Sequence, residues 1–487
     1  MKLSRCLVAP LTVALFCLAS ASPAQTGCAP TTGTAAAGLP NFSGTIVPNV
    51  FAIPPGGQYL YMKTQYGVVR GSLANPAAAG PFKLAQIGDK TMGGVDNGGK
   101  VPLNCDCYQP SLTMDAAEAP DGTARMITDW NNLGGGLGAE VAVADSANNM
   151  YFGQQIDDGT RVQGSRVAAL YLASGKYVGY IPFASSSGGG VAVVDVSSPT
   201  GDASIGGAID PFSTLAWGNG AAVVLKSAHV GSLYLLAGAV SLENKIRIAE
   251  VDPNTGIPNP TAIIATTGGV SALSIAQVNS RTFIFSAEGT SGIQVYEYAS
   301  GALSHTGAIT GGNYNEVVVT GGLFPLIFAH NTVTLSVESY IDAFDTNWVT
   351  QGGAPRQAAH LRHYGAPEHF TFPGFQAMVV GNSAYVYRLE TTPSNAIETT
   401  SLDISCISIS PTSPPIVNSV ATNLSAQQRS GTERNKNYLG DQLELKDASA
   451  SAPVNPLLEI SWDFNYTGTF VPDPAWNGVT YNVANSD

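Results

Sequence analysis

The stretch IRIAEVDPNTGIPNP, residues 246–260, combines a strand pattern with a turn pattern and is the part of the sequence that decides the fold. In its first half Ile246 and Ile248 alternate with Arg247 and Ala249, which predicts a β-strand with two different faces. The letters DPNTG that follow are the residue types that build tight turns. A second apolar run, TAIIATT, comes directly after them. The stretch therefore predicts a strand, a turn and a second strand.

The same letters also allow a metal site. Asp252, Asn254 and Gly256 have the spacing that opens a calcium-binding loop. Such a loop, starting at Asp252, needs a bidentate carboxylate at its twelfth position, and that position is Ile263. We therefore expect a turn here, with a calcium loop as the alternative.

The strand–turn–strand pattern recurs along the chain, for example in GVAVVDVSSPTGDASIGGAI and GIQVYEYASGALSHTGAI. The expected turns fall near residues 78, 148, 200, 255, 300, 345 and 394. Two further strand patterns precede most of these hairpins, so that each unit has four strands. A period of about 50 residues with four short strands is typical of β-propeller blades. We predict an all-β protein whose residues 40–408 form an approximately seven-bladed β-propeller.

The turn VDPNTG resembles the hairpin of quinoprotein-like and YVTN-like propellers, in which an Asp-x-x-Thr-Gly turn joins the two outer strands of a blade. The Trp that quinoprotein repeats have after this turn is absent here. The sialidase motif S-x-D-x-G-x-T-W and the tryptophan–aspartate blade ending are absent as well. The resemblance implies a propeller fold and no particular activity.

The N-terminus has the three parts of a secretory signal peptide. Lys2 and Arg5 are followed by the apolar run 7–18 and by the small residues 19–21. We predict a signal peptide over residues 1–21, and hence a secreted, periplasmic or cell-surface protein. A lipoprotein acylated at Cys28 is the alternative, although the usual Leu is missing before that cysteine.

Charge excludes some classes of partner. Only 12% of the residues are charged and the formal net charge is −13, which removal of the signal peptide's two cations would make more negative by two. Such a balance argues against binding nucleic acid. No apolar run outside the signal peptide is long enough to predict a membrane span.

Four cysteines remain after the signal peptide, and they allow three pairings. Export favours structural disulfides. We choose Cys28–Cys406 first, because these residues flank the propeller and ring closure brings its ends together. A redox pair of Cys105 and Cys107 is the alternative. The cluster NCDCYQP lacks two more nearby ligands for a zinc site.

The composition changes after the propeller repeat. A Pro- and Ser-rich linker is expected over residues 409–419. Beyond it, LELKDASAS and the triplet 462–464, Trp-Asp-Phe, resemble a PKD-type immunoglobulin-like domain, although the Gly-Asp-Gly that commonly follows the triplet in that family is absent here. The resemblance implies a small β-sandwich over residues 420–487, complete or incomplete, of a kind that serves as a spacer or adhesion module.

One cluster of side chains has the composition of a site. The segment HLRHYGAPEHF brings His360, His363, Glu368 and His369 within ten residues. Imidazoles with a carboxylate suit a divalent metal such as zinc or copper, or a general base with an acid. Pro367 argues against a helix that would preset their geometry. A polar loop with solvated histidines is the competing interpretation, and it is the one that we favour.

Other motifs are weaker. Asp157 and Asp158 form an acidic pair that suits either calcium or a solvated turn, and the glycine-rich segment 134–139 precedes a strand pattern and is expected to be a loop. No G-x-S-x-G, H-E-x-x-H or G-x-x-x-x-G-K-[ST] motif occurs.

These patterns favour a binding or adhesion scaffold, with the propeller as the platform for a protein or glycan ligand and the PKD-like domain as a spacer. The alternative is an extracellular propeller enzyme of lactonase, lyase or hydrolase type, with a metal or a His/carboxylate site. The side chains that line the propeller axis distinguish the two. Histidines that converge with carboxylates favour the enzyme, whereas Gly, Ser and apolar plugs favour the scaffold.

Overall fold

The structure is a computed structural model, and it describes the chain in segments. These are residues 30–33, 50–54, 56–64, 67–80, 82–86, 114–132, 136–147, 149–157, 166–185, 188–197, 212–218, 222–240, 243–321, 325–332, 339–363, 375–390, 396–404, 419–423 and 443–447.

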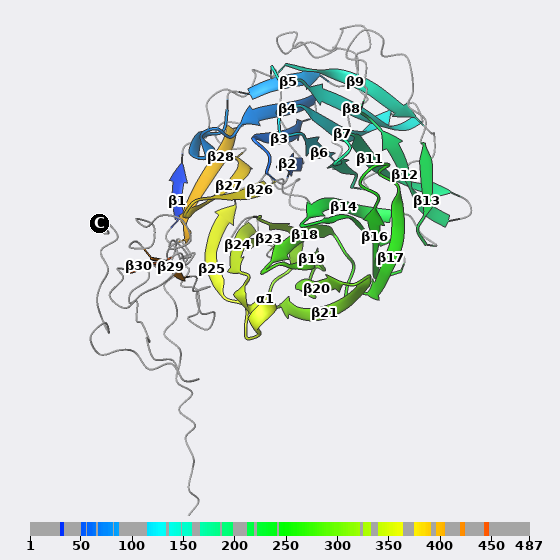
Figure 1. The fold of residues 1–487 in the computed structure, drawn as a ribbon. Coiled ribbons are helices and arrows are strands. Elements are labelled where there is room, and N and C mark those ends of the chain that lie inside the picture. Colours follow the sequence, from blue (N-terminus) through cyan, green and yellow to red (C-terminus); the bar gives the residue numbers. More distant parts are fainter. Residues whose placement is uncertain are drawn as a thin grey trace, which may run out of the picture.

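Seven four-stranded antiparallel sheets stand around a common axis (Figure 1), and we number them as blades in chain order. Blade 1 contains β2 (Val50–Ala52), β3 (Tyr59–Thr64), β4 (Gly67–Ser72) and β5 (Phe82–Gln86). Blade 2 contains β6 (Met114–Glu118), β7 (Ala124–Asn132), β8 (Gly136–Ala144) and β9 (Met150–Asp157). Blade 3 contains β10 (Ala168–Tyr171), β11 (Tyr177–Ser185), β12 (Gly188–Asp195) and β13 (Ser213–Ala216). Blades 4 and 5 contain β14 (Ala222–Val230), β15 (Leu233–Val240), β16 (Lys245–Val251) and β17 (Pro258–Ala265); and β18 (Ala272–Val278), β19 (Arg281–Ala287), β20 (Ile293–Ala299) and β21 (Ala302–Ile309). Blade 6 contains β22 (Tyr314–Val319), β23 (Leu326–Thr332), β24 (Ser339–Asp345) and β25 (Gln357–His363).

The chain closes the ring by adding a strand from its N-terminal side to the last blade. Blade 7 consists of β26 (Phe375–Val380), β27 (Ser383–Glu390) and β28 (Ala396–Asp403), and its fourth strand is β1 (Pro30–Gly33) from the N-terminal side. Pro30 pairs with Leu402 in antiparallel register. Strand β1 lies before residue 40, so the described ring begins earlier in the chain than the expected range.

The prediction of an all-β, seven-bladed propeller is confirmed. In blades 1 to 6 the expected turn position lies between the third and fourth strands. In blade 7 the expected position near residue 394 lies between the second and third strands instead, and β1 supplies the fourth strand. Among the described residues, helix is limited to α1 (Asn347–Gln351), in the connection of β24 to β25, to the 3₁₀ turn η1 (Pro76–Ala78) between β4 and β5, and to Ile404, a 3₁₀ residue after β28.

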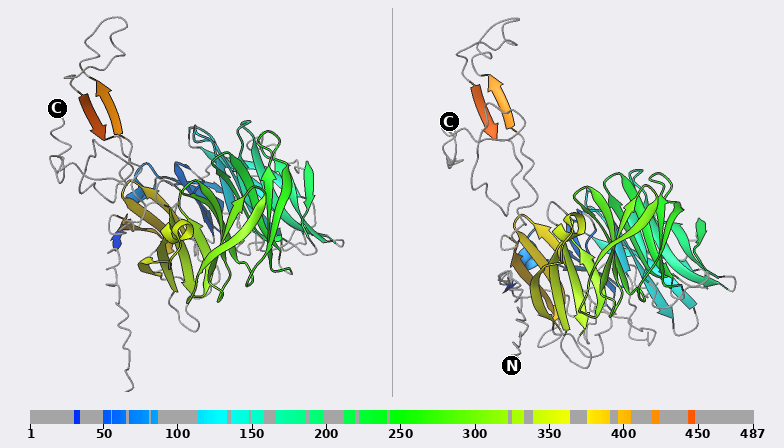
Figure 2. Two further views of the ribbon diagram at one scale, coloured as in Figure 1. Left: turned by 60° about the horizontal axis from the view of Figure 1, so that its bottom comes forward. Right: turned by 90° about the horizontal axis from the view of Figure 1, so that it is seen from below.

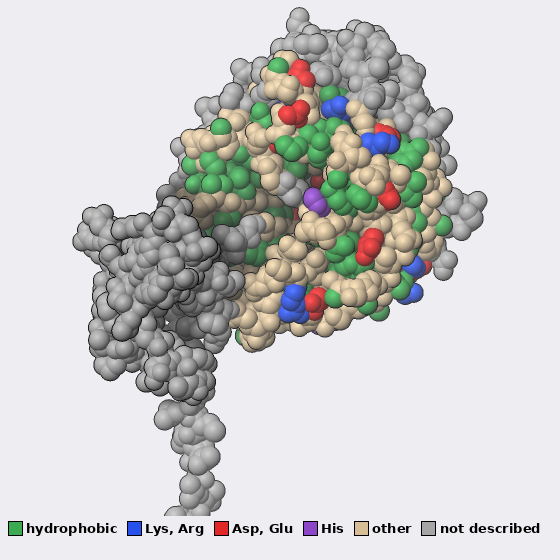
Figure 3. Space-filling model, in the orientation of Figure 1, with side chains coloured by type: hydrophobic (Ala, Val, Ile, Leu, Met, Phe, Trp, Pro, Cys, Tyr) green, Lys and Arg blue, Asp and Glu red, His purple; other side chains and the backbone are tan. Residues whose placement is uncertain are grey.

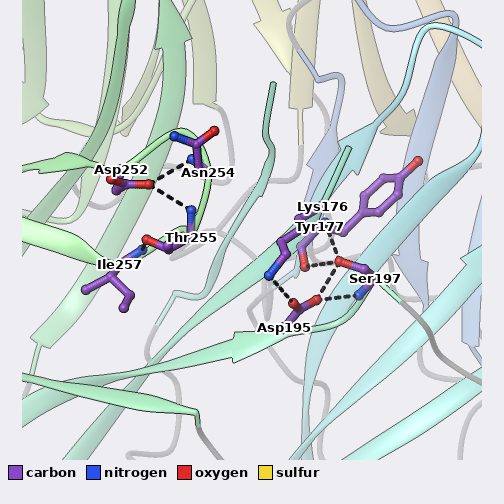
Figure 4. Close-up of polar contacts among 8 residues, drawn as sticks. All are labelled: Lys176, Tyr177, Asp195, Ser197, Asp252, Asn254, Thr255 and Ile257. Atoms are coloured by element: carbon purple, nitrogen blue, oxygen red, sulfur yellow. Dashed lines mark hydrogen bonds and ion pairs between the residues drawn. The ribbon is translucent and has the colours of Figure 1, made fainter. Parts of the chain in front are cut away.

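The stretch that opened the sequence analysis forms the hairpin between β16 and β17 (Figure 4). The Asp252 Oδ1 accepts hydrogen bonds from the backbone N–H groups of Asn254 and Thr255, both at 2.8 Å. These two bonds hold the pKa of Asp252 below its usual value. The Gly256 N–H donates to the Asp252 carbonyl at 2.8 Å, and Gly256 has φ +79°. The predicted turn is confirmed, and the Asp252 carboxylate is used in holding it.

The hydrophobic core is divided into layers that lie between blades. Seven clusters of buried residues occur in the described part of the chain, and each combines side chains of two neighbouring blades. One of them joins blade 7 to blade 1, through residues such as Tyr387 and Leu60. Seen edge-on, the sheets stand side by side around the ring (Figure 2). Because a single blade is apolar on both faces, closure of the ring covers every face.

Beyond the ring, the structure describes a two-stranded ladder of β29 (Ser419–Asn423) and β30 (Leu443–Asp447). The remainder of the expected linker and immunoglobulin-like domain lies outside the described residues, as does the expected signal peptide. A search of the described part of the chain finds no helix of the length and apolarity that a membrane span requires.

Candidate functional site

The first strands of the seven blades surround a central channel of about 710 Å³. Each of these strands contacts the first strands of both neighbouring blades, and all seven blades contribute residues to the lining. Figure 3 shows the hollow at the centre of the ring, with hydrophobic side chains around it and a histidine at its edge. The lining combines apolar and polar surface in similar amounts, and four charged side chains are part of it.

One ion pair crosses the channel. Arg166 lies just before β10 in blade 3, and Glu316 lies on β22 in blade 6. Two parallel hydrogen bonds join them, from Nη1 to Oε1 at 2.9 Å and from Nη2 to Oε2 at 2.6 Å. The side chains are 21% and 14% exposed. A bidentate guanidinium–carboxylate pair is the geometry in which charge-assisted hydrogen bonds are strongest.

A second ion pair lies on the wall formed by blades 2 to 4. The Lys226 Nζ on β14 lies 3.2 Å from the Asp115 Oδ1 on β6. The Asp115 Oδ2 accepts a hydrogen bond from the backbone N–H of Ala169 at 3.1 Å. Asp115 is 9% exposed, whereas the Lys226 side chain is 34% exposed, so the cation is the more accessible partner.

Short polar contacts between first strands fix the wall around these pairs. The Ser227 hydroxyl donates to the Ala169 carbonyl at 2.7 Å, and the Leu225 N–H donates to the Arg166 carbonyl at 3.2 Å. On the other side of the ring the Ser274 hydroxyl accepts from the Val319 N–H at 3.1 Å. Small serine side chains let neighbouring first strands approach closely enough for these bonds. The charged side chains therefore stand on a wall that is already ordered without a ligand.

The two cations retain hydrogen-bond donors. A lysine ammonium has three N–H groups and an arginine guanidinium has five. Among the described residues, Lys226 uses one donor, on Asp115, and Arg166 uses two, on Glu316. The channel is therefore rich in donors, and it suits a ligand with many acceptor oxygens.

The structure places one of the sequence-predicted site residues in a polar network on blade 6. His360 lies on β25, and its Nδ1 forms a short hydrogen bond with the Asp342 Oδ1 on β24. The same carboxylate accepts from the Gln357 amide at 2.8 Å, the Asn331 amide at 3.0 Å and the Tyr314 hydroxyl at 3.2 Å. Burial, together with the Asp342 charge, raises the pKa of Tyr314 above its usual range. Asp342 is thus a fully engaged carboxylate that ties the four strands together.

The ring of His360 stacks on Tyr340, with centroids 4.0 Å apart and an interplanar angle of 17°. Its side chain is 51% exposed, in contrast to 2% for Asp342. With Nδ1 bonded to the carboxylate, Nε2 has no hydrogen-bond partner among the described residues. This is the orientation that prepares an imidazole to accept a proton or a metal ion.

The other predicted site residues are not assembled by the described structure. His363 ends the same strand, three positions from His360, and Glu368 and His369 lie outside the described residues. Asp158 lies outside them too, as do the cysteines at 28, 105, 107 and 406. Within the segments that the structure describes, no three His, Cys, Asp or Glu side chains gather as a metal site would require.

A further carboxylate, the partly buried Glu118, belongs to the contact of blades 1 and 2 rather than to the channel. It accepts hydrogen bonds from the Gln58 N–H and the Tyr61 hydroxyl, both at 2.7 Å. Burial raises the pKa of Glu118. Because both oxygens bind the start of β3 in blade 1, its role is structural.

Four charged residues of the channel are not predicted from the sequence: Asp115, Arg166, Lys226 and Glu316. Arg166, Lys226 and Glu316 are single charged residues at or next to a mostly apolar first strand, as in VVLKSAHV and NEVVV, whereas Asp115 shares β6 with Glu118. In a chain with so few charged residues, the placement of these single residues is the signal that would have identified them. The pairing of Lys226 with Asp115 has no such signal, because the partners are far apart in the sequence.

No protein-family model matches the chain, and no curated protein is similar to it. Among solved structures, the chain resembles a candidate 6-phosphogluconolactonase from Bacteroides uniformis at 12% sequence identity, with a TM-score of 0.42, over 70% of this chain and 90% of that one. It also resembles hydrazine synthase from Kuenenia stuttgartiensis at 12% identity, with a TM-score of 0.43, over 74% of this chain and 97% of that one. Similarities this weak do not support either activity for this chain.

Proposed function

We propose that the chain is a secreted or cell-surface binding or adhesion protein that holds its ligand in the central channel of the propeller. The observation that carries this proposal is the channel itself. Its volume of about 710 Å³ lies within the range of roughly 300–1,000 Å³ common for small-molecule sites.

The charges in the channel support binding more than acid–base chemistry. Each of its two ion pairs neutralises a carboxylate with a cation from another blade. His229 lines the channel, but its ring stacks on Tyr234, with centroids 4.0 Å apart. Among the described residues, no histidine forms a hydrogen bond with a channel carboxylate. By the criterion set from the sequence, the axis resembles that of a scaffold.

Equilibrium dialysis against a defined mixture of sugars, amino acids and organic acids tests the proposal. Mass spectrometry of both compartments should show at least one compound enriched with the protein and recovered unchanged. The double variant Arg166→Met/Glu316→Leu should reduce that enrichment. A compound consumed rather than retained would identify an enzyme instead, and equal enrichment by the variant would place the site elsewhere.

An extracellular enzyme of lactonase, lyase or hydrolase type is the second candidate, and the His360–Asp342 pair is the observation that favours it. The buried carboxylate orients the imidazole, and the exposed Nε2 would act as a general base or a metal ligand. In the same dialysis experiment, turnover abolished by His360→Gln would support this candidate. One equivalent of zinc or copper lost in a His360→Ala/His363→Ala variant would support its metal form.

Export is part of the proposal and rests on residues 1–21. The N-terminal sequence of protein recovered from outside the cytoplasm should begin after Ala21, as expected for signal-peptide cleavage. The PKD-like region would act as a spacer between the ring and a surface.

A further inference from the structure

We propose that the channel ligand is an uncharged saccharide, whose oxygens accept hydrogen bonds from Lys226 and Arg166. This inference rests on the proposed function and names the ligand class for the same site. It follows from three properties of the channel: its open donors, its charge balance and its apolar wall.

The open donors require acceptor atoms on the ligand. Lys226 has two N–H groups, and Arg166 three, that no described residue accepts. Asp115 uses one oxygen for Lys226 and the other for the Ala169 N–H, yet each carboxylate oxygen has a second lone pair. Hydroxyl groups are both donors and acceptors, so neighbouring hydroxyls on one ring match an ammonium and a carboxylate that lie 3.2 Å apart.

The charge balance selects an uncharged ligand. Two cations and two carboxylates leave the four side chains with no net charge. An anion that approached Lys226 would also approach Asp115, and it would lose its own hydration on entry. The free-energy cost of desolvating a charged ligand is offset only where the site offers an unpaired opposite charge. A neutral polyol meets the same donors without that cost.

The apolar part of the lining suits the C–H faces of a sugar ring. Ile53 of blade 1, Val318 of blade 6 and Met378 of blade 7 belong to it, and each is only partly buried. An apolar wall with few fixed polar groups orients a ligand that has both kinds of surface. Because backbone and serine hydrogen bonds already fix the polar groups, little ordering is required on binding.

Isothermal titration with matched neutral and anionic probes tests the inference. The neutral probes are maltotriose, triacetylchitotriose, galactotriose and fully methyl-esterified trigalacturonate, and the anionic probe is free trigalacturonate. We expect at least one neutral probe to bind, with a dissociation constant that changes less than about twofold between low and high salt. Free trigalacturonate should bind more weakly than its own methyl ester.

The test variant is Asp115→Asn/Lys226→Met, which removes the donors without leaving a buried charge unpaired. It should weaken binding of the neutral probe by about tenfold, as expected for the loss of one or two hydrogen bonds. The control is Asp195→Asn/Lys176→Met. It removes a pair of the same chemistry and the same 3.2 Å separation at the exposed edge of blade 3 (Figure 4) and should leave binding unchanged. Thermal unfolding of both variants checks that the ring is intact.

The outcomes separate the two proposals. Stronger, salt-dependent binding of free trigalacturonate that is lost in the channel variant would overturn the neutral ligand class and keep the channel site. Binding of any probe that the channel variant leaves unchanged would overturn both. If the compounds retained in dialysis are uncharged saccharides and depend on Lys226, the inference stands; if they are amino acids or organic acids, it falls.

Discussion

Gly256 and Gly301 have nearly the same φ angle but different neighbours, and we expect them to differ in how well they tolerate substitution. Gly256 has φ +79° and Gly301 has φ +78°. An added Cβ at Gly256 would lie 2.5 Å from the Val178 Cγ2 of blade 3, whereas nothing lies within 4 Å of one at Gly301. The hairpin at Gly256 is thus packed against the neighbouring blade, where Tyr180 also donates to the Gly256 carbonyl at 2.9 Å.

We therefore expect Gly256→Ala to lower the free energy of unfolding by about 2–4 kcal/mol, the sum of a left-handed backbone penalty and an overpacked contact. Gly301→Ala should lower it by only about 1–2 kcal/mol, because the backbone penalty acts alone. Urea unfolding followed by fluorescence measures both. Equal losses in the two variants would mean that the contact with Val178 does not constrain the turn.

The Arg281–Glu297 pair gives the stability a pH dependence. Nη2 and Oε2 lie 2.5 Å apart, and the hydrogen bond from Arg281 holds the pKa of Glu297 below its usual value. A lowered pKa in the folded state contributes stability above the unfolded pKa, and this contribution is lost as the pH falls. Glu297→Gln should therefore cost about 0.2–1 kcal/mol at pH 7, as for other exposed pairs. Denaturant midpoints of wild type and variant should converge below about pH 4; a constant difference would argue for a packing effect.

Individual residues differ in how far the sequence reveals their role. The Asp252 turn was predictable because all its partners lie within five residues. The His360–Asp342 pair was predictable only by half, because the histidine cluster is visible in the sequence but its carboxylate lies on another strand. The two ion pairs of the channel join residues of different blades, so no local sequence pattern predicts them.

At the scale of the strands, the Arg166–Glu316 pair couples a segment of blade 3 to β22 of blade 6. Removing one partner leaves a largely buried charge unpaired, so Arg166→Met or Glu316→Leu alone should each destabilise by about 1–3 kcal/mol. The double variant should lie close to wild type, because it leaves no charge alone. A double-mutant cycle by urea unfolding measures this coupling; strictly additive losses would show that the two side chains act independently.

The predicted Cys28–Cys406 disulfide stays a prediction, because both cysteines lie outside the described residues, but the β1–β28 pairing brings the two ends of the ring together. Pro30 pairs with Leu402, and Cys28 and Cys406 lie two and four residues beyond these partners in the sequence. We expect non-reducing peptide mapping of the exported protein to recover a linked Cys28–Cys406 peptide. Loss of such a link, in Cys28→Ser/Cys406→Ser, should cost roughly 5 kcal/mol if the bond is unstrained. Four free thiols in the denatured, unreduced protein would refute the pairing.

For the whole molecule, the repeat was the most predictable feature, because each blade uses the same local turn chemistry. The source of the last outer strand was not predictable in that way. Strand β1 has only four residues, PTTG, and no strand pattern of its own, so its place depends on an open edge of β28 that exists only in the folded ring.

The propeller and the C-terminal region should be separable. The seven core clusters between blades and the β1–β28 pairing lie entirely within residues 30–404 of the described chain. Limited proteolysis between residues 411 and 419 should release the C-terminal region and leave the melting temperature of the ring within about 2 °C, since no described core contact is cut. A large fall in melting temperature or loss of a cooperative transition would show that the two parts share a core.

The pairing of β1 with β28 also sets the order in which parts of the ring assemble during synthesis. Blades 1 to 6 are each built from consecutive strands, so each pairs only strands that are close together in the sequence. The N-terminal strand is made first, but its partner is among the last residues of the ring to be made. Contacts between such distant segments are the slowest to form. The earliest part of the chain must therefore wait, unpaired, until nearly the whole propeller has been translated, and the final step of assembly is a meeting of its two ends.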